Sequence, residues 1–160
     1  MMSTFDTLNV LKKLNGWKVV ADFSVGGLEW LGFSRSNPNK MIIISSQKTT
    51  ILNCDNGKIE ECIIEYDEQE LIAICEQLPN EEIPISGQYG GKLSDCSMYG
   101  ERVKIETNDK FITTVLFSSA YDKECVIYQN YGPYTCGFSD NGNYFVLADD
   151  VGIIVIKRYQ

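Results

Sequence analysis

The sequence predicts a mainly β fold, an antiparallel sandwich or partly closed barrel with propeller-blade-like strand repeats and two short helices. The first observation is a unit that occurs twice: Gly32-Phe33-Ser34 and Gly137-Phe138-Ser139 each precede a polar turn and two apolar runs. The second is the Asn56-Gly57 pair, which favours the positive φ angles of a hairpin turn. The third is a series of about a dozen short apolar runs between turn residues, a spacing typical of sandwiches, barrels and propeller-like sheet stacks.

The first element is expected to be an amphipathic helix over residues 4–14. Ser3 and Asp6 resemble a capping box, and Phe5, Leu8 and Leu11 recur at helical spacing. Asn15-Gly16 is a stop signal that ends the helix. Strands are then expected at 17–23, 28–33, 41–45, 49–54 and 59–65, and the apolar run of the third predicts a central strand.

A second helix is predicted over residues 67–78. Asp67 is its N-cap candidate, and Glu70 occupies the capping-box position. Pro79 ends the segment. Its apolar stripe consists of Leu71, Ile74, Cys75 and Leu78.

The rest of the chain is expected to be β. Residues 83–100 are rich in glycine and serine and predict a long irregular segment. Strands are expected at 102–106, 111–117, 125–128, 135–138, 144–148 and 153–158. The sequence predicts a single domain over 1–160, with quasi-repeated β units near 17–66 and 101–160.

Composition excludes several classes of function. The chain has no histidine, which removes Ser-His-Asp and Cys-His catalysis and histidine-bound zinc. Its formal net charge is −8, and no lysine or arginine occurs between Lys58 and Lys92, where nine acids lie. Such a surface repels phosphate, so nucleic-acid binding is not expected. No apolar stretch predicts a membrane span, and the first residues predict no secretory signal, so a cytoplasmic protein is expected.

Reactive-site motifs give no convincing match. The six cysteines form no Cys-x-x-Cys pair and are expected to be structural, with no metal and no cofactor. Gly90-Gly91-Lys92 lacks the glycine spacing and the following Ser or Thr of a phosphate loop. Two acid pairs, Asp122 with Glu124 and Asp149 with Asp150, are the candidates for a carboxylate-based hydrolase, but Asp149-Asp150 is also typical of a hairpin turn. Asp140 begins a turn that lacks the last acid of a calcium loop.

Two features remain as candidate binding sites. Three tyrosines lie among turn residues, and tyrosine is enriched at binding surfaces, although these side chains also suit a strand core and a sheet edge. The acids around 67–78 suit a basic protein partner, or alternatively a solvated face that maintains solubility. The candidate partner-binding residues are Glu61, Glu65, Asp67, Glu68, Glu70, Tyr128, Tyr131 and Tyr134.

The order of motifs resembles a group of small bacterial all-β proteins with Gly-Phe-Ser strand repeats. The similarity rests on Val25-Gly-Gly-Leu-x-x-Leu-Gly-Phe-Ser34, on the Gly-Gly-x-Leu segment 90–93 and on the closing Gly-Phe-Ser-x-x-Gly at 137–142. These motifs consist of turns and strands. The resemblance implies a β fold and carries no activity, cofactor or catalytic residue.

The sequence therefore favours a non-enzymatic, acidic, intracellular protein-binding protein of unknown oligomeric state. An immunity-like protein that masks a basic partner is the leading interpretation. A small-ligand module that binds a sugar or metabolite through loop 86–100 and the tyrosines is the first alternative. A carboxylate-based hydrolase is the second.

Overall fold

The structure is a computed structural model that describes residues 1–120 and 123–159. The fold is mainly β, as predicted: the described residues form one α-helix and four antiparallel sheets with separate strand orders, and these sheets do not join into a closed barrel. The predicted first helix is confirmed as α1 (Thr4–Lys12). Its capping box is present, because the Ser3 side chain accepts the Asp6 N–H and the Asp6 carboxylate accepts the Ser3 N–H.

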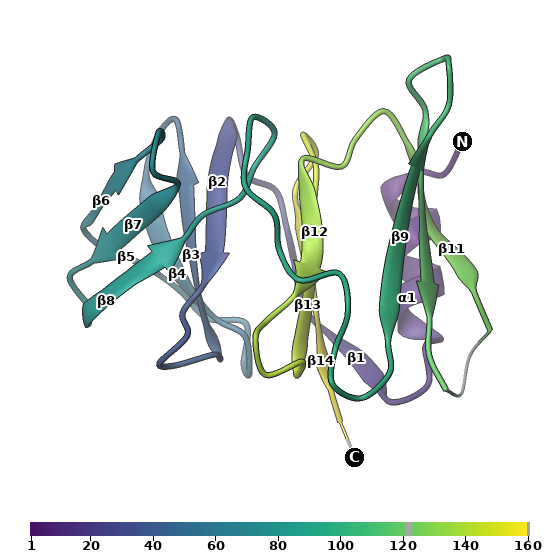
Figure 1. Cartoon of the computed structure of the whole chain (residues 1–160), viewed down its shortest axis with the longest axis horizontal. Coiled ribbons are helices and arrows are strands. Elements are labelled where there is room, and N and C mark those ends of the chain that lie inside the picture. Colours follow the sequence, from purple (N-terminus) through teal and green to yellow (C-terminus); the bar gives the residue numbers. More distant parts are fainter. Residues whose placement is uncertain (121–122, 160) are drawn as a thin grey trace.

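We number the sheets by their position in Figure 1, from the β6 end to the α1 end. The first sheet contains β6 (Ile64–Asp67), β7 (Ile72–Cys75) and β8 (Leu78–Pro84). The second contains β2 (Leu28–Phe33), β3 (Lys40–Ser45), β4 (Thr49–Asn53) and β5 (Ile59–Glu61). The third has the order β1 (Trp17–Phe23), β14 (Ile153–Arg158), β13 (Tyr144–Ala148) and β12 (Thr135–Phe138). The fourth has the order β11 (Cys125–Asn130), β10 (Thr113–Ser118) and β9 (Arg102–Thr107).

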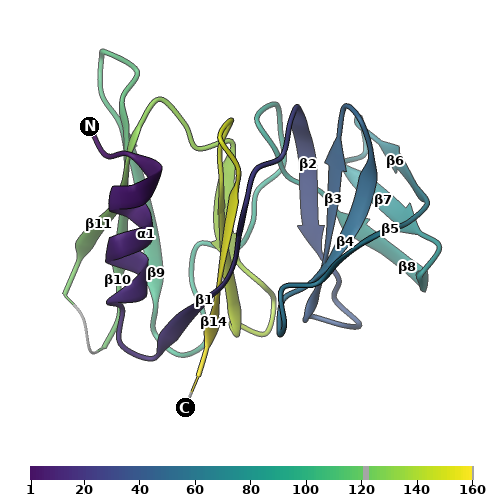
Figure 2. The same ribbon diagram turned by 180° about the vertical axis from the view of Figure 1, so that it is seen from behind.

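The four sheets lie face to face in a stack, and a separate hydrophobic core fills each of the three gaps (Figures 1 and 2). The second and third sheets are therefore buried on both faces, which explains their continuous apolar runs. In β3, Ile42 and Ile44 enter the core toward the first sheet, whereas Met41 and Ile43 enter the core toward the third. The helix α1 packs against β1 and β11 and adds Leu11 to the core between the third and fourth sheets.

The two Gly-Phe-Ser units occupy equivalent places. One ends β2 and the other ends β12, and each leads into a three-stranded meander, β2–β3–β4 or β12–β13–β14. In each unit the serine N–H closes the following turn, from Ser34 to the Lys40 carbonyl (2.9 Å) and from Ser139 to the Tyr144 carbonyl (2.9 Å). The next residues, Arg35 and Asp140, form an exposed ion pair (3.1 Å), so the two turns lie side by side.

The glycine of each unit allows another chain segment to pass close by. A Cβ atom at Gly137 would lie 2.7 Å from the Ser94 carbonyl oxygen, and a Cβ atom at Gly32 would overlap the Pro84 carbonyl oxygen. The passing segment is the end of β8 and the connection from β8 to β9, which the sequence predicts to be irregular. It pairs Ser86 with Leu31 at the edge of β2 and then Ser94 with Phe138 at the edge of β12. This connection therefore joins the second sheet to the third.

The predicted second helix is wrong. Residues 67–78 form the end of β6, a turn, β7 and the start of β8. Asp67 does cap a turn, since its Oδ1 accepts the N–H groups of Gln69 (2.8 Å) and Glu70 (3.0 Å), but the chain then reverses at Leu71 (φ 55°). A strand buries Ala73 and Cys75 against the second sheet, and burial of this alternate face outweighs the helical spacing.

Polar groups near the C-terminal strand also connect the sheets. Between the third and fourth sheets, Arg158 donates two hydrogen bonds of 2.6 Å to the carboxylate of Glu101. Its guanidinium carbon lies 4.5 Å from the ring centroid of Trp17 and 4.1 Å from that of Tyr99. Between the second and third sheets, Asp55 accepts a hydrogen bond from the Tyr144 hydroxyl (2.6 Å) and pairs with Lys157 (2.9 Å).

Candidate functional site

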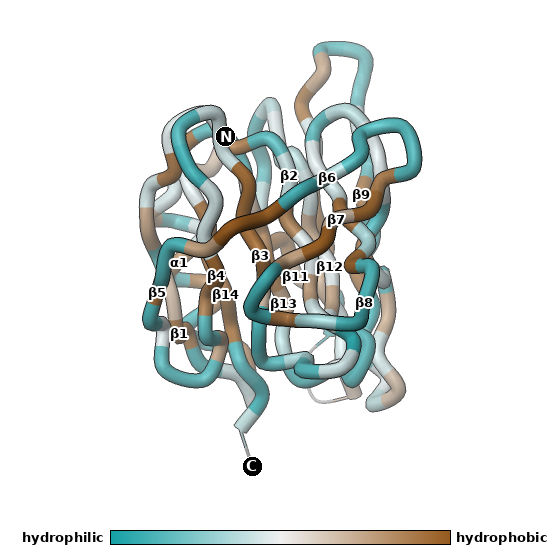
Figure 3. The backbone as a smooth tube through the Cα atoms, turned by 90° about the vertical axis from the view of Figure 1, so that its left-hand side faces the viewer, coloured by the Kyte–Doolittle hydropathy of each residue, from teal (hydrophilic) through white to brown (hydrophobic). Residues whose placement is uncertain are grey.

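The acids singled out in the sequence gather at one end of the stack. Glu61 lies on β5, Glu65 and Asp67 on β6, and Glu68 and Glu70 in the turn between β6 and β7. Together with the outward side of the first sheet, we call these residues the acidic face. Figure 3 views the molecule from this end and shows β6, β7 and β8 nearest the viewer. No described sheet covers this side of the first sheet.

Apolar side chains lie among the carboxylates of the acidic face. Glu65 is the cross-strand partner of Ile74, and Ile74 is 51% exposed. Ile63, just before β6, is 66% exposed. On the other side of the same strands, Ile64 and Cys75 are buried against the second sheet. The first sheet thus has one apolar face in the core and one mixed acidic and apolar face in solvent.

Some acids of this face accept hydrogen bonds within the protein, and others are exposed. Asp67 holds the turn described above, and Glu68 accepts a hydrogen bond of 3.3 Å from the indole N–H of Trp30. Glu61 is exposed and belongs to the short strand β5, which forms an edge of the second sheet. Glu65 and Glu70 are also exposed. We therefore regard Glu61, Glu65 and Glu70 as the side chains best placed to meet a partner.

Glu81, another acid of the first sheet, has a structural role that the sequence gives no signal for. Its carboxylate accepts the Ser36 hydroxyl (2.6 Å), the Arg35 N–H (3.1 Å) and the Ser34 hydroxyl, so it holds the turn of the first Gly-Phe-Ser unit. Burial acts to raise the pKa of Glu81, but these hydrogen bonds outweigh it and the pKa lies below its ordinary value. Glu81 is thus a turn-fixing residue that joins β8 to β2.

The structure does not bring the three tyrosines together with the acids. Tyr128 and Tyr131 lie at the end of β11 in the fourth sheet, at the opposite end of the stack from the acidic face (Figure 1). Tyr134 packs against the core between the second and third sheets. The eight residues predicted as one binding set therefore belong to separate regions.

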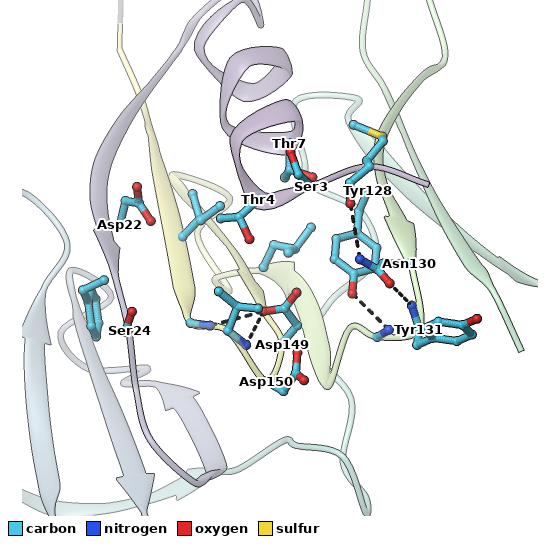
Figure 4. A pocket seen from close by; sticks show the side chains of 17 residues that line it. Ser3, Thr4, Thr7, Asp22, Ser24, Tyr128, Asn130, Tyr131, Asp149 and Asp150 are labelled. Carbon is cyan, nitrogen blue, oxygen red and sulfur yellow. Dashed lines mark hydrogen bonds between the residues drawn. The ribbon is translucent and has the colours of Figure 1, made fainter.

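Tyr128 and Tyr131 do line a pocket of about 560 Å³ (Figure 4). Four elements meet there: the start of α1, the end of β1, the end of β11 and the turn between β13 and β14. Loop 86–100, predicted to share a ligand site with the tyrosines, contributes no residue to the lining. The members that sequence reasoning missed include Ser3, Thr4, Thr7 and Asp22, and no local motif marks them.

The turn between β13 and β14 gives the pocket two carboxylates. Asp149 Oδ1 accepts the N–H groups of Val151 (2.9 Å) and Gly152 (3.2 Å), so the hairpin-turn interpretation of Asp149-Asp150 holds. The same turn places both acids beside tyrosines. Burial, followed by the charge of Asp149, raises the pKa of Tyr128, and burial with the charge of Asp150 raises that of Tyr134. The two aspartates therefore add negative charge at this end of the third sheet.

The remaining sequence candidates stay apart from this pocket. Glu124 is exposed, and its predicted partner Asp122 lies outside the described residues. Residues 139–144 form the turn of the second Gly-Phe-Ser unit, in which Asn141 Oδ1 accepts the Ser139 hydroxyl and the Asn143 N–H. Among the described residues, no three Cys, Asp or Glu side chains gather in a way that would hold a metal ion.

Neither a scan against protein-family models nor a search of curated proteins found a match to this chain. Within residues 1–120 and 123–159, α1 is the only helix, and it is too short to cross a bilayer.

Proposed function

We propose that this chain is a non-enzymatic protein-binding module whose acidic face binds a basic protein partner, in the manner of an immunity protein. The observation that carries the proposal is the solvent side of the first sheet, where exposed Ile63 and Ile74 lie among Glu61, Glu65 and Glu70. Protein interfaces commonly combine an apolar centre with a polar rim. The acidic face has this composition.

Charge determines the kind of partner. No lysine or arginine occurs between Lys58 and Lys92, the segment that forms the first sheet and its edges. Like charges juxtaposed across an interface are unfavourable, whereas complementary charges accelerate association and select partners. A basic surface with apolar side chains at its centre therefore fits the acidic face, and nucleic acid does not.

The open edge of the first sheet supports the same function. Among the residues that the structure describes, β6 pairs with β7 alone, so its other edge presents backbone groups beside Glu65 and Asp67. Extended segments of partner proteins bind such edges by adding a strand. The proposal also includes the finer architecture: the stack is an open sandwich, its two Gly-Phe-Ser units are propeller-blade-like repeats, and the protein acts in the cytoplasm.

A charge-reversal series tests the acidic face. Tagged wild-type protein and the Glu61→Lys/Glu65→Lys/Glu70→Lys variant are used to capture partners from source-cell extract at low and moderate salt. The matched control, Asp95→Lys/Asp109→Lys/Glu124→Lys, changes the net charge equally with exposed acids outside the acidic face. We expect a basic protein that wild type and control retain at low salt and that the acidic-face variant loses.

Two results would refute this function. One is the absence of any captured protein whose retention depends on salt. The other is equal loss of the captured protein in both charge-reversal variants, because the effect would then come from net charge rather than from the acidic face. Circular dichroism of each variant checks that the β fold is intact before capture.

A small-ligand binding module is the second candidate function. The pocket beside Tyr128 and Tyr131 supports it, because ligand sites in proteins are concave and combine an apolar lining with a few polar groups.

A further inference from the structure

The pocket between the third and fourth sheets has the build of a site for one small molecule. Its volume of about 560 Å³ lies within the range of roughly 300–1,000 Å³ that such sites occupy. Leu147 and Ile154 of the third sheet, both core residues, give it an apolar floor. Thr7 is only 2% exposed and also lines the pocket.

The charged groups around this floor all have the same sign. Asp22 at the end of β1 and Asp149 and Asp150 in the β13–β14 turn line the pocket from the side of the third sheet (Figure 4). No lysine or arginine is among the lining residues, all of which the structure describes. Asp22 and Asp150 are exposed, and one oxygen of Asp149 is occupied by the turn. These carboxylates would repel an anionic ligand.

Two phenol rings line the pocket from the side of the fourth sheet. Tyr128 is 4% exposed, and its hydroxyl accepts the Gly132 N–H at 3.0 Å, which fixes the ring in place. Tyr131 is 67% exposed and stands at the rim. Aromatic faces attract cations, most strongly where water is excluded. Carboxylates on one side and phenol rings on the other thus favour a positive group on a flat or apolar body.

We propose that this pocket binds a small organic cation, an ammonium, amidinium or guanidinium group carried on an apolar or aromatic body. The proposal rests on the second candidate function, a small-ligand module, and is independent of the acidic face. The charged group lies between Asp22, Asp149 and Asp150, where its N–H groups donate to carboxylate oxygens. The body of the ligand lies over Leu147 and Ile154 and against the ring of Tyr131.

Three isosteric probes test the charge requirement: benzamidine (cation), benzamide (neutral) and benzoate (anion). Each is titrated to millimolar concentration against the full chain, with the melting temperature and amide ¹H–¹⁵N chemical shifts as readouts. A ligand that binds only the folded state raises the melting temperature with its concentration. We expect this rise for benzamidine alone, with saturable shifts at Gly132, Val151 and Gly152.

Variants locate the site. Asp22→Asn/Asp150→Asn removes two exposed charges without removing the Asp149 turn, and we expect benzamidine to bind at least about tenfold more weakly. Tyr131→Ala removes an exposed ring and should also weaken binding. The matched control Glu60→Gln/Glu82→Gln removes two exposed charges on β5 and β8, at the other end of the stack, and should bind benzamidine as wild type does.

The outcomes separate this proposal from the function on which it rests. Equal binding of benzamide or benzoate would refute the cation class while leaving a small-ligand module in place. Binding of none of the three probes would refute both. Unchanged benzamidine affinity in Asp22→Asn/Asp150→Asn would refute the assignment to this pocket.

Discussion

Replacing Glu101 with glutamine tests whether its ion pair with Arg158 fastens the fourth sheet to the third. The side chains of Glu101 and Arg158 are only 6% and 15% exposed, so solvent screens the pair weakly. Glutamine keeps the shape of the side chain and one acceptor oxygen, but its amide group points N–H donors at the N–H donors of the guanidinium. Arg158 then keeps the Gly142 carbonyl (2.7 Å) and the two aromatic rings as its partners.

The cost follows from breaking one side of a buried pair. Removing one partner of a buried ion pair destabilises a protein by about 3–5 kcal/mol, because the other charge stays buried and uncompensated. Glutamine retains one acceptor and Arg158 retains the rings of Trp17 and Tyr99, so we expect the lower end, about 3 kcal/mol. Urea unfolding followed by tryptophan fluorescence measures it, since Trp17 lies in the core between the third and fourth sheets and Trp30 lies in the core between the first and second.

The matched control is Glu106→Gln, which removes the charge of the exposed Lys104–Glu106 pair (3.1 Å) and should leave stability unchanged. A loss below about 1 kcal/mol for Glu101→Gln would refute the reasoning, because desolvation of the pair would then cancel its attraction. Acid adds a second readout. Burial acts to raise the pKa of Glu101, but the hydrogen bonds from Arg158 and Ser97 outweigh it and the pKa lies below 4.5. The stabilisation from the ionised Glu101 is present above its unfolded-state pKa and is lost as pH falls through its folded-state pKa. The wild type should therefore lose stability below pH 4.5 more steeply than the glutamine variant.

Three further substitutions or modifications probe other contacts. Tyr144→Phe removes the hydroxyl that donates to Asp55. The Asp55 side chain is 38% exposed, so water can replace the donor, and we expect urea unfolding to show a loss of stability of about 1 kcal/mol. No loss would show that this hydrogen bond does not stabilise the fold. Gly32→Ala should lower the stability of the fold by about 2 kcal/mol or more, because its Cβ would overlap the Pro84 carbonyl oxygen. The control Gly26→Ala has open space around its Cβ and should not destabilise the protein. Equal melting temperatures of the two variants would contradict the close approach at Gly32. In the folded protein, iodoacetamide should modify the exposed Cys96 well before Cys54, because Cys54 is buried and burial raises its pKa to about 12. Peptide mass spectrometry after a short pulse measures the labelling of each cysteine. Early labelling of Cys54 would mean that the core around it opens.

Local patterns predicted most of the fold, because most strands carry their own signal. The run Met41–Ile44 indicated a central strand, and β3 lies between β2 and β4 with a core on each side. The capping box at Ser3 marked the start of α1 correctly. The segment 67–78 failed because Leu71, Ile74, Cys75 and Leu78 fit a helix and a pair of strands almost equally well. Only the second sheet, which buries Ala73 and Cys75, decides between them.

The strand predicted at 111–117 begins later in the structure. Phe111 lies in the turn with φ 64° and is 76% exposed, and β10 begins at Thr113. Apolar character alone assigned this residue to a strand. The Asn108 side chain explains the difference, because its Oδ1 accepts the N–H groups of Lys110 and Ile112 and lengthens the turn.

Most residues of the pocket could not be predicted from the sequence. Tyr128 and Tyr131 were candidates, but the residues that share the pocket with them come from the start of α1, the end of β1 and the β13–β14 turn. Asp22 and Asp149 are far apart in the chain, and they meet because β1 pairs with β14 in the third sheet. The pairing of strands that are far apart in the chain produces no periodic pattern in the sequence, so a single sequence does not predict it.

The pairing of β1 with β14 has a consequence for how the protein is made. Trp17 lies opposite Arg158, so on the ribosome the early strand β1 has no hydrogen-bonding partner until β14 has been synthesised. The second sheet, by contrast, is built from β2 to β5 in chain order and is complete once residue 61 is available. Nascent chains would therefore hold a folded β2–β5 meander beside an unpaired apolar strand, an intermediate prone to association until β14 emerges.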